Sequence, residues 1–265
     1  MTTVPFEPRR FRTTAAYYSR FRVPYPDALI ERVTARTGLR PGDRLLDLGC
    51  GPCQIGIAFA RLAGADVTGL DPEPEMLETA RDNAAAAGVR AELVLGSSYD
   101  LGPAFAPLKM TVMGRSFHWM DRAATLQVLD TLTEPRGTVV LFGDRHISAS
   151  PAWRETMESV SERLSPEEMR AERQLRRGPD FGKHEEFLLR SAFRNLEHIG
   201  IVTERVIDAD EIVGRAFSMS VTSPQALGDR TMEFEQTMRS ELAALAPDGK
   251  FTEIVESNAL IAFRD

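Results

Sequence analysis

Several features are missing from this sequence, and each absence narrows its class. No apolar run approaches the roughly 20 residues that span a bilayer, and the N-terminus lacks the charged and then apolar layout of a signal peptide. Long basic runs are also missing: 32 Lys and Arg stand against 39 Asp and Glu, a formal net charge of -7. Such a chain binds phosphate backbones poorly, although a local basic patch is compatible with that charge. We therefore expect a cytoplasmic protein without a membrane segment or a nucleic-acid partner.

Cysteine is scarce as well. The chain has only Cys50 and Cys53, which form a C-x-x-C motif. In an α/β protein this motif is redox-active, half of a zinc site, or a pair of small residues in a tight loop. No second Cys or His pair at ligand spacing accompanies it, so we expect no metal site. Internal repeats and low-complexity segments are absent too.

The remaining composition is that of an ordinary soluble globular chain. It has 265 residues, of which 43% are hydrophobic and 27% charged. A chain of this length can bury a sizeable core, as one large domain or two small ones. Composition alone does not choose between these arrangements.

A glycine loop organises the first half of the chain. An apolar run, Leu45-Leu46-Asp47-Leu48, ends in Gly49-Cys50-Gly51, and a second short strand ends at Asp71. This pattern predicts a buried strand that turns sharply into a helix, followed by a second parallel strand. Glycines let a ligand approach the backbone, and the helix start offers unpaired N–H groups. An acid at the end of the second strand has the spacing that accepts hydrogen bonds from ribose hydroxyls.

The loop differs from the dinucleotide fingerprint, which would need glycine at Gln54, and this disfavours a nicotinamide dehydrogenase. Instead, Asp47-Leu48-Gly49-Cys50-Gly51-Pro52-Cys53 resembles motif I of the class I S-adenosylmethionine (SAM) dependent methyltransferases. Cys53 replaces the third glycine and is expected to crowd the methionine part of the cofactor. Gly69-Leu70-Asp71-Pro72-Glu73-Pro74-Glu75-Met76-Leu77 resembles motif II of the same family.

The resemblance implies SAM as the cofactor and a particular set of contacts. In similar proteins a Tyr and an Arg of the N-terminal segment reach the cofactor carboxylate, a pattern that Tyr18 and Arg22 match. Packing of the N-terminal helix onto the sheet is the alternative role for these two residues. Adenine is expected near the third strand, at Asp100 or at the backbone of Ser98 and Tyr99. The full expected cofactor set is Tyr18, Arg22, Asp47, Gly49, Cys50, Gly51, Asp71, Pro72, Met76, Ser97, Ser98, Tyr99, Arg115 and Ser116.

Polar chemistry also follows strands four and five. Phe117-His118-Trp119-Met120-Asp121 comes after the fourth strand and resembles a segment of small-molecule methyltransferases of the trans-aconitate and ubiquinone-biosynthesis type. His118 is therefore a candidate for orienting the acceptor or taking its proton, and the alternative is a bond to its own loop. A fifth strand over 137–142 is followed by Asp144 and His146, which makes His146 a second catalytic candidate.

The family resemblance covers nearly the whole chain. It implies an α/β fold with a Rossmann-like, doubly wound, seven-stranded sheet whose last strand is antiparallel. We expect a single domain over 1–265: a helical cover at 1–40, where Asp27 caps a helix, a cofactor core at 41–147, an acceptor lid at 148–195, and strands six and seven with helices at 196–265. The charged part of the lid is alternatively a solvated helix, and 218–224 is expected to border the acceptor pocket.

Three functions remain after this reading. The leading one is methyl transfer from SAM to a small molecule, with secondary metabolites among the acceptors. The second keeps the cofactor pocket for other chemistry, such as cyclisation or decarboxylation. The third is a non-catalytic SAM-binding scaffold, which would predict loss of the cofactor motifs, yet Asp47, Gly49, Gly51 and Asp71 are all present. The acceptor, the methylated atom and the oligomeric state are left open.

Overall fold

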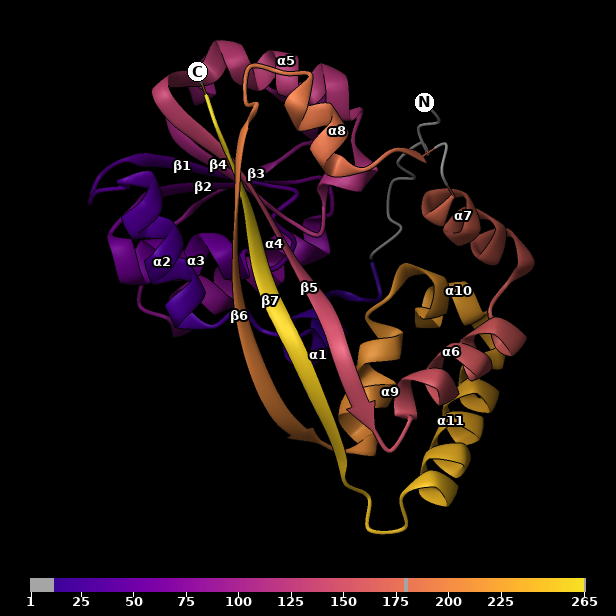
Figure 1. Cartoon of the computed structure of the whole chain (residues 1–265). Helices are drawn as coiled ribbons and strands as arrows, with labels where there is room; N and C mark the ends of the chain where they lie inside the picture. Colours follow the sequence, from indigo (N-terminus) through magenta and orange to yellow (C-terminus); the bar gives the residue numbers. More distant parts are fainter. Residues whose placement is uncertain (1–11, 179–180, 265) are drawn as a thin grey trace.

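The computed structural model describes residues 12–178 and 181–264. Within these residues, seven strands form one sheet in the order β3-β2-β1-β4-β5-β7-β6 (Figure 1). β1 to β5 are parallel, and β7 runs antiparallel to both β5 and β6. The strands are β1 Arg44–Leu48, β2 Asp66–Asp71, β3 Glu92–Leu95, β4 Leu108–Gly114, β5 Thr133–Ser150, β6 Asn195–Ile207 and β7 Phe251–Phe263. The predicted doubly wound sheet with an antiparallel seventh strand is confirmed.

Helices cover both faces of the parallel part of the sheet. One face carries α2 (Asp27–Thr37), α3 (Gln54–Ala63) and α4 (Pro74–Ala86). The other carries α5 (Arg122–Leu132) and α8 (His184–Leu189). This two-sided cover explains why β1 reads as an almost continuous apolar run, since parallel strands are buried on both faces. No helix of the described part is long and apolar enough to cross a membrane.

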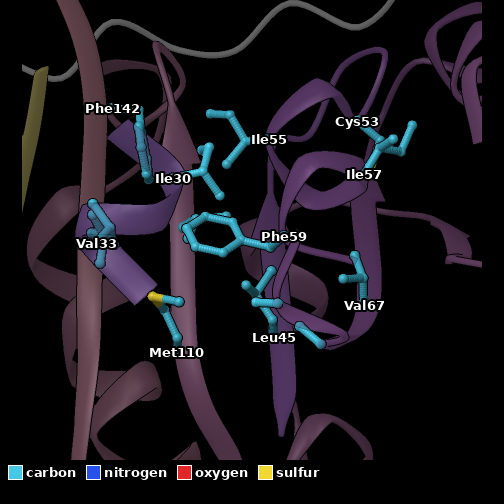
Figure 2. Packing of buried hydrophobic residues seen from close by; sticks show 14 of the residues in the cluster. Ile30, Val33, Leu45, Cys53, Ile55, Ile57, Phe59, Val67, Met110 and Phe142 are labelled. Carbon is cyan, nitrogen blue, oxygen red and sulfur yellow. The ribbon is translucent and has the colours of Figure 1, made fainter. Parts of the chain in front are cut away.

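The core on the α2 and α3 face is built around Phe59. Figure 2 shows its ring between Ile30 and Ile55 on one side and Leu45 on the other. Phe59 is fully buried, and its ring meets that of Phe142 edge-on at 6.0 Å between centroids. Removing a buried phenylalanine ring costs ~3–5 kcal/mol, so this cluster is a main anchor of α3 and hence of the loop before it.

The sheet continues well beyond the parallel core as a ribbon of three strands, β5, β7 and β6 (Figure 1). β5 runs to Ser150 and pairs with β7 up to Thr252, so the prediction that it ends at Phe142 is wrong. Residues 143–150 are strand because β7 supplies a long partner, which local sequence does not reveal. Asp144 and His146 accordingly lie inside β5.

A second helical layer packs on this ribbon. It consists of α6 (Trp153–Leu164), α9 (Ala209–Phe217), α10 (Pro224–Leu227) and α11 (Thr231–Leu245), which share a core around the fully buried Trp153 and Phe234. α1 (Ala15–Phe21) contacts α9 and α4. α7 (Glu167–Arg177) lies between this layer and α8 (Figure 1).

Two helix starts carry an aspartate at or next to the cap position. Asp121 caps α5, because its side chain accepts a hydrogen bond of 3.0 Å from the Ala124 N–H. Asp27 does not cap α2: Pro26 holds the cap position, and Asp27 is the first helical residue and pairs with Arg61. An acid in the first turn interacts favourably with the helix dipole, as an acid at the N-cap does. The sequence therefore did not distinguish the N-cap from the first helical residue.

Candidate functional site

A cavity of about 1090 Å³ opens at the carboxyl edge of the parallel strands, where ligands of α/β sheets usually bind. Most of the predicted site residues line it together, although they come from distant parts of the sequence. They are Tyr18, Arg22, Gly49, Cys50, Gly51, Asp71, Pro72, Met76, Ser97, Ser98, Tyr99, Arg115, Ser116 and His118. The two exceptions among the predicted residues are Asp47 and His146, which lie behind the cavity wall.

Gly49 shapes the loop at the end of β1. Its φ of +65° lies in the left-handed region, and a Cβ at this position would come within 2.6 Å of the Ser116 Cβ. Ser116 in turn donates a 2.7 Å hydrogen bond to the Leu48 carbonyl. The loop after β1 is therefore pressed against the loop after β4, and only glycine fits between them.

Asp71 connects the second strand to the glycine loop. Its carboxylate accepts hydrogen bonds from the Gly51 N–H at 2.7 Å and the Glu73 N–H at 3.0 Å. Burial raises the pKa of Asp71 to about 6 against the opposing effect of these two bonds. A carboxylate has room for about four hydrogen bonds, so Asp71 can still accept from a ligand hydroxyl in the cavity.

Asp47 supports the loop from below. It is 1% exposed and accepts a 2.9 Å hydrogen bond from the Gly56 N–H in the first turn of α3. Burial raises the pKa of Asp47 to about 7. Because Asp47 does not line the cavity, its position favours holding α3 in place over direct ligand contact.

Cys53 adopts a left-handed backbone conformation, with φ 55° and ψ 31°, which residues other than glycine seldom take. Its side chain is fully buried and points away from the cavity, toward Gly56 and Gly69. The expectation that it crowds the cofactor is therefore wrong: a side chain at this position turns under the loop. Both cysteines are buried free thiols, and Cys50 lies at the cavity wall.

The N-terminal segment closes one side of the cavity with Tyr18 and Arg22. The Arg22 guanidinium lies 5.1 Å from the Tyr18 ring centroid and donates from Nη2 to the Ser218 carbonyl at 3.1 Å. Its Nε is buried and makes no hydrogen bond with any described residue. An unsatisfied buried donor of a cation is costly, so this nitrogen marks a place for an anionic ligand group.

The segment after β4 forms the short 3-10 helix η3 (Phe117–Trp119), which brings His118 and Trp119 to the cavity. The Arg176 guanidinium of α7 covers the Trp119 ring at 3.6 Å, and the His184 ring lies 6.4 Å from that of His118. Burial, followed by the charge of Arg176, lowers the pKa of His118 to about 3. Burial likewise lowers the pKa of His184 to about 4. Both imidazoles are neutral at pH 7.

Arg115 and Asp144 form a pair in the opposite wall. Arg115 Nε donates to Asp144 at 2.6 Å, and its guanidinium lies 4.7 Å from the Tyr25 ring centroid. Burial alone would raise the pKa of Asp144, but Arg115 outweighs it and holds that pKa below its ordinary value. His146 lies behind this pair, 3.7 Å from Asp144 and 3.5 Å from the buried Glu253.

Sequence reasoning missed several cavity residues. Motif II contains Glu73 but gave it no role, and the amide of Asn258 comes from the middle of β7. The segment after β5, expected as a lid but without named residues, contributes Arg173, Arg176 and 181–185. The segment 218–224 was expected at the pocket, and its Met219, Ser220 and Val221 do line the cavity. The general expectation of a lid after β5 could have found the arginines, because α7 is too charged to be buried in a core.

Comparisons with known proteins agree with this geometry. The sequence pattern of a family described as a methyltransferase domain matches residues 45–137, which hold the glycine loop, Asp71 and His118. This part of the chain carries the methyltransferase domain of the class I SAM-dependent methyltransferases.

Two relatives and one solved structure show which known proteins this methyltransferase domain is similar to. A ubiquinone biosynthesis O-methyltransferase of Xanthomonas campestris pv. campestris is 36% identical over 115 residues, 42% of this chain and 47% of that protein. A ribosomal protein L11 methyltransferase of Laribacter hongkongensis is 29% identical over 102 residues, 38% of this chain and 33% of that protein. The chain thus spans about half the length of the first relative and a third of the second.

The structural comparison covers the full chain. The crystal structure of a SAM-dependent methyltransferase from Geobacter sulfurreducens, in complex with S-adenosyl-L-homocysteine, has a TM-score of 0.55 and 18% identity, with all of both chains covered. At this identity the likeness concerns the fold alone. The sequence matches to the two relatives, in contrast, cover only 42% and 38% of this chain.

Proposed function

We propose that this chain transfers a methyl group from SAM to a small-molecule acceptor. The observation that carries the proposal is the continuity of the cavity. One wall contains the glycine loop and Asp71, and the same space reaches His118, Trp119 and α7. A methyl donor and an acceptor can therefore meet in one continuous cavity.

The residues present fit the donor. Gly49 gives the close backbone approach that the loop needs, and Asp71 would accept from the ribose hydroxyls. The orphaned Nε of Arg22 would bind the carboxylate of the methionine part, next to Tyr18. Ser97, Ser98 and Tyr99 line the cavity where adenine is expected. Asp100 is turned away, because its carboxylate accepts hydrogen bonds from the Ser97 N–H and hydroxyl.

The chemistry asks mainly for alignment and exclusion of water. When bound, SAM supplies a methyl group that the positive sulfonium has already activated. The chain contributes walls from both of its halves, which hold the two reactants at near-attack distance. The neutral His118 and Trp119 at the cavity wall orient the acceptor.

A small acceptor is supported by the acidic chain, which has a formal net charge of -7. The name of the Xanthomonas relative, an O-methyltransferase of ubiquinone biosynthesis, agrees with such an acceptor. We propose no nucleic-acid or membrane partner.

The two alternatives have less support. Chemistry other than methyl transfer was suggested by Cys53, and that side chain points away from the cavity. A binding scaffold is disfavoured because Gly49, Gly51 and Asp71 keep the geometry of a working loop. No further feature of the described residues favours either of them.

Calorimetric titration with SAM and S-adenosylhomocysteine, with NADH as a control, tests the proposal. We expect micromolar binding of the first two and none of NADH. Asp71→Ala should weaken binding at least tenfold, about 1.4 kcal/mol, because the ribose loses its acceptor. Asp66→Ala, an exposed acid at the start of the same strand, should leave binding unchanged. Absence of binding to the unaltered chain would contradict the proposed function.

A further inference from the structure

The two cysteines of the chain lie side by side beneath the glycine loop. Cys50 and Cys53 are the first and last residues of a turn, in which the Cys53 N–H donates a 2.9 Å hydrogen bond to the Cys50 carbonyl. The Cα atoms at the ends of such a turn are less than about 7 Å apart, a separation that a disulfide can bridge. A hydrogen bond also joins the two thiols. The backbone of this turn therefore suits a reversible disulfide.

Two glycines make room for the pair. A Cβ at Gly69 would stand 3.1 Å from both sulfur atoms. A Cβ at Gly56 would stand 2.8 Å from the Cys53 Sγ and 3.1 Å from an Asp47 carboxylate oxygen. Gly69 lies within β2 and Gly56 within α3, where glycine is less favourable than alanine. The two thiols and the carboxylate thus occupy one space between β1, β2 and α3 that larger side chains would fill.

The two thiols differ in their access to the cavity. Cys50 lies in the cavity wall and is 9% exposed, whereas Cys53 is fully buried behind it. A small molecule in the cavity therefore meets the Cys50 sulfur first. Thiol–disulfide exchange proceeds through a mixed disulfide, which a neighbouring thiol then resolves. Cys50 is placed to form the mixed disulfide, and Cys53 is placed to resolve it.

The reactive form of cysteine is the thiolate, so the pair needs a proton acceptor. The hydrogen bond with Cys53, followed by burial, raises the pKa of the Cys50 thiol well above its ordinary value, and the nearby charges of Asp47 and Asp71 raise it further. The Cys53 thiol in turn donates a hydrogen bond to the Asp47 carboxylate. Burial raises the pKa of Asp47 to about 7, which suits a base that works near neutral pH.

We propose that Cys50 and Cys53 form a redox couple, which a small disulfide entering the cavity oxidises and which the bound methyl donor protects by covering Cys50. The protection rests on the function proposed above, whereas the oxidation does not.

The oxidation takes place in two steps. The Cys50 sulfur attacks the small disulfide RSSR, forms a mixed disulfide and expels one RS−, while its proton passes through the Cys53 thiol to Asp47. The Cys53 sulfur then gives its proton to Asp47, attacks the Cys50 sulfur and expels the second RS−. Asp47 releases each proton to a departing RS−. Two electrons thus pass from the dithiol to RSSR, and the products are the protein disulfide and two RSH.

Intact mass spectrometry tests the couple without methyl transfer. Reduced, ligand-free protein is equilibrated near neutral pH with bis(2-hydroxyethyl) disulfide and 2-mercaptoethanol at a series of ratios, quenched with acid, denatured, and labelled with N-ethylmaleimide. The chain has two cysteines, so each product has its own mass. We expect a doubly labelled form that converts to an unlabelled internal disulfide and returns with excess mercaptoethanol. Protein that stays doubly labelled at every ratio, or that forms disulfides between chains, would overturn the proposal.

Three variants separate the roles of the residues. Cys53→Gly, which suits the left-handed backbone, should stop at the mixed disulfide of Cys50. Cys50→Ser should not react in the folded state, and a mixed disulfide at Cys53 would overturn the assigned order. Asp47→Asn should slow disulfide formation by about tenfold or more, whereas Asp66→Asn, at an exposed position of β2, should not. Equal rates for these two aspartate variants would overturn the role of Asp47.

The same assay with saturating S-adenosylhomocysteine tests the protection. Oxidation should become slower by about tenfold or more, because the ligand covers Cys50 and only the unliganded fraction reacts. An unchanged rate on protein that binds S-adenosylhomocysteine by calorimetry would overturn the protection. If S-adenosylhomocysteine does not bind, the proposed function and the protection fail together, while oxidation of the ligand-free protein still decides whether Cys50 and Cys53 are a redox couple.

Discussion

Replacing Asp47 with asparagine should change how the stability of the protein depends on pH. Asp47 is 1% exposed, and burial raises its pKa to about 7 in the folded state, with the Gly56 N–H bond acting in the opposite direction. In the unfolded chain an aspartate has a pKa of about 3.9. Between these values the folded state keeps a proton that the unfolded state has lost, so the free energy of unfolding falls as pH rises.

The magnitude follows from this difference of about three pH units. At about 1.36 kcal/mol per unit, Asp47 costs the folded state up to about 4 kcal/mol by pH 8 relative to pH 4. Asparagine has nearly the same shape and an oxygen that can accept from the Gly56 N–H, but it does not titrate. The free energy of unfolding of the variant should therefore rise relative to that of the unaltered protein between pH 4 and pH 8. A constant difference caused by the amide itself would not change this trend.

Urea unfolding of the ligand-free protein at intervals from pH 4.5 to 8 measures the effect. The difference between the two free energies of unfolding should grow by a few kcal/mol toward pH 8. Asp66→Asn, at an exposed position of β2, should give a difference that does not vary with pH. A constant difference for Asp47→Asn as well would refute the reasoning, because Asp47 would then be ionised throughout.

Two further predictions concern the loop and the histidine. Gly49→Ala should reduce S-adenosylhomocysteine affinity at least tenfold by calorimetry, because the new Cβ would lie 2.6 Å from the Ser116 Cβ. Gly88→Ala is the control, since Gly88 has a similar φ of +67° but open space around it. This variant should lose only about 1 kcal/mol of stability and keep its affinity for S-adenosylhomocysteine. Equal affinity of the two variants would contradict the steric argument. His118, with its pKa lowered to about 3, should show the nitrogen NMR shifts of a neutral imidazole from pH 8 down to pH 5, with assignment by His118→Asn. A titration near pH 6.5 would contradict the burial of this ring.

Sequence predicted which residues of the first half of the chain gather at one cavity because the signals there are local. Glycines at fixed spacing and Asp71 at a strand end dictate one loop, and motif and structure agree there. Asp47 was predicted to contact the cofactor, but it does not line the cavity. Side chains alternate between the two faces of a strand, so Asp47 lies on the same face of β1 as Leu45, under α3. This alternation was visible in the sequence.

The acceptor half was predictable only in outline. The length of β5 depends on pairing with β7, more than a hundred residues away, and a polar stretch such as 143–150 carries no sign of it. The position of α7 over Trp119 depends on how α6 and α8 pack at its two ends. Neither is a property of a short window of sequence, and His146 was misjudged for the same reason, since it faces Glu253 of the long partner strand.

Because of the extended ribbon of β5, β7 and β6, the two parts of the cavity wall come from different parts of the sequence. The residues that we propose for the donor lie before residue 120, whereas most of the remaining wall comes from Leu141 and the segments after it, which are carried by the ribbon and its own helical core. On the function proposed above, changes in α7 should alter which acceptor binds without touching the glycine loop, whereas changes in 218–224 would also reach Arg22 through the Ser218 carbonyl. Evolution or design could therefore change the acceptor through α7 and keep the glycine loop as it is.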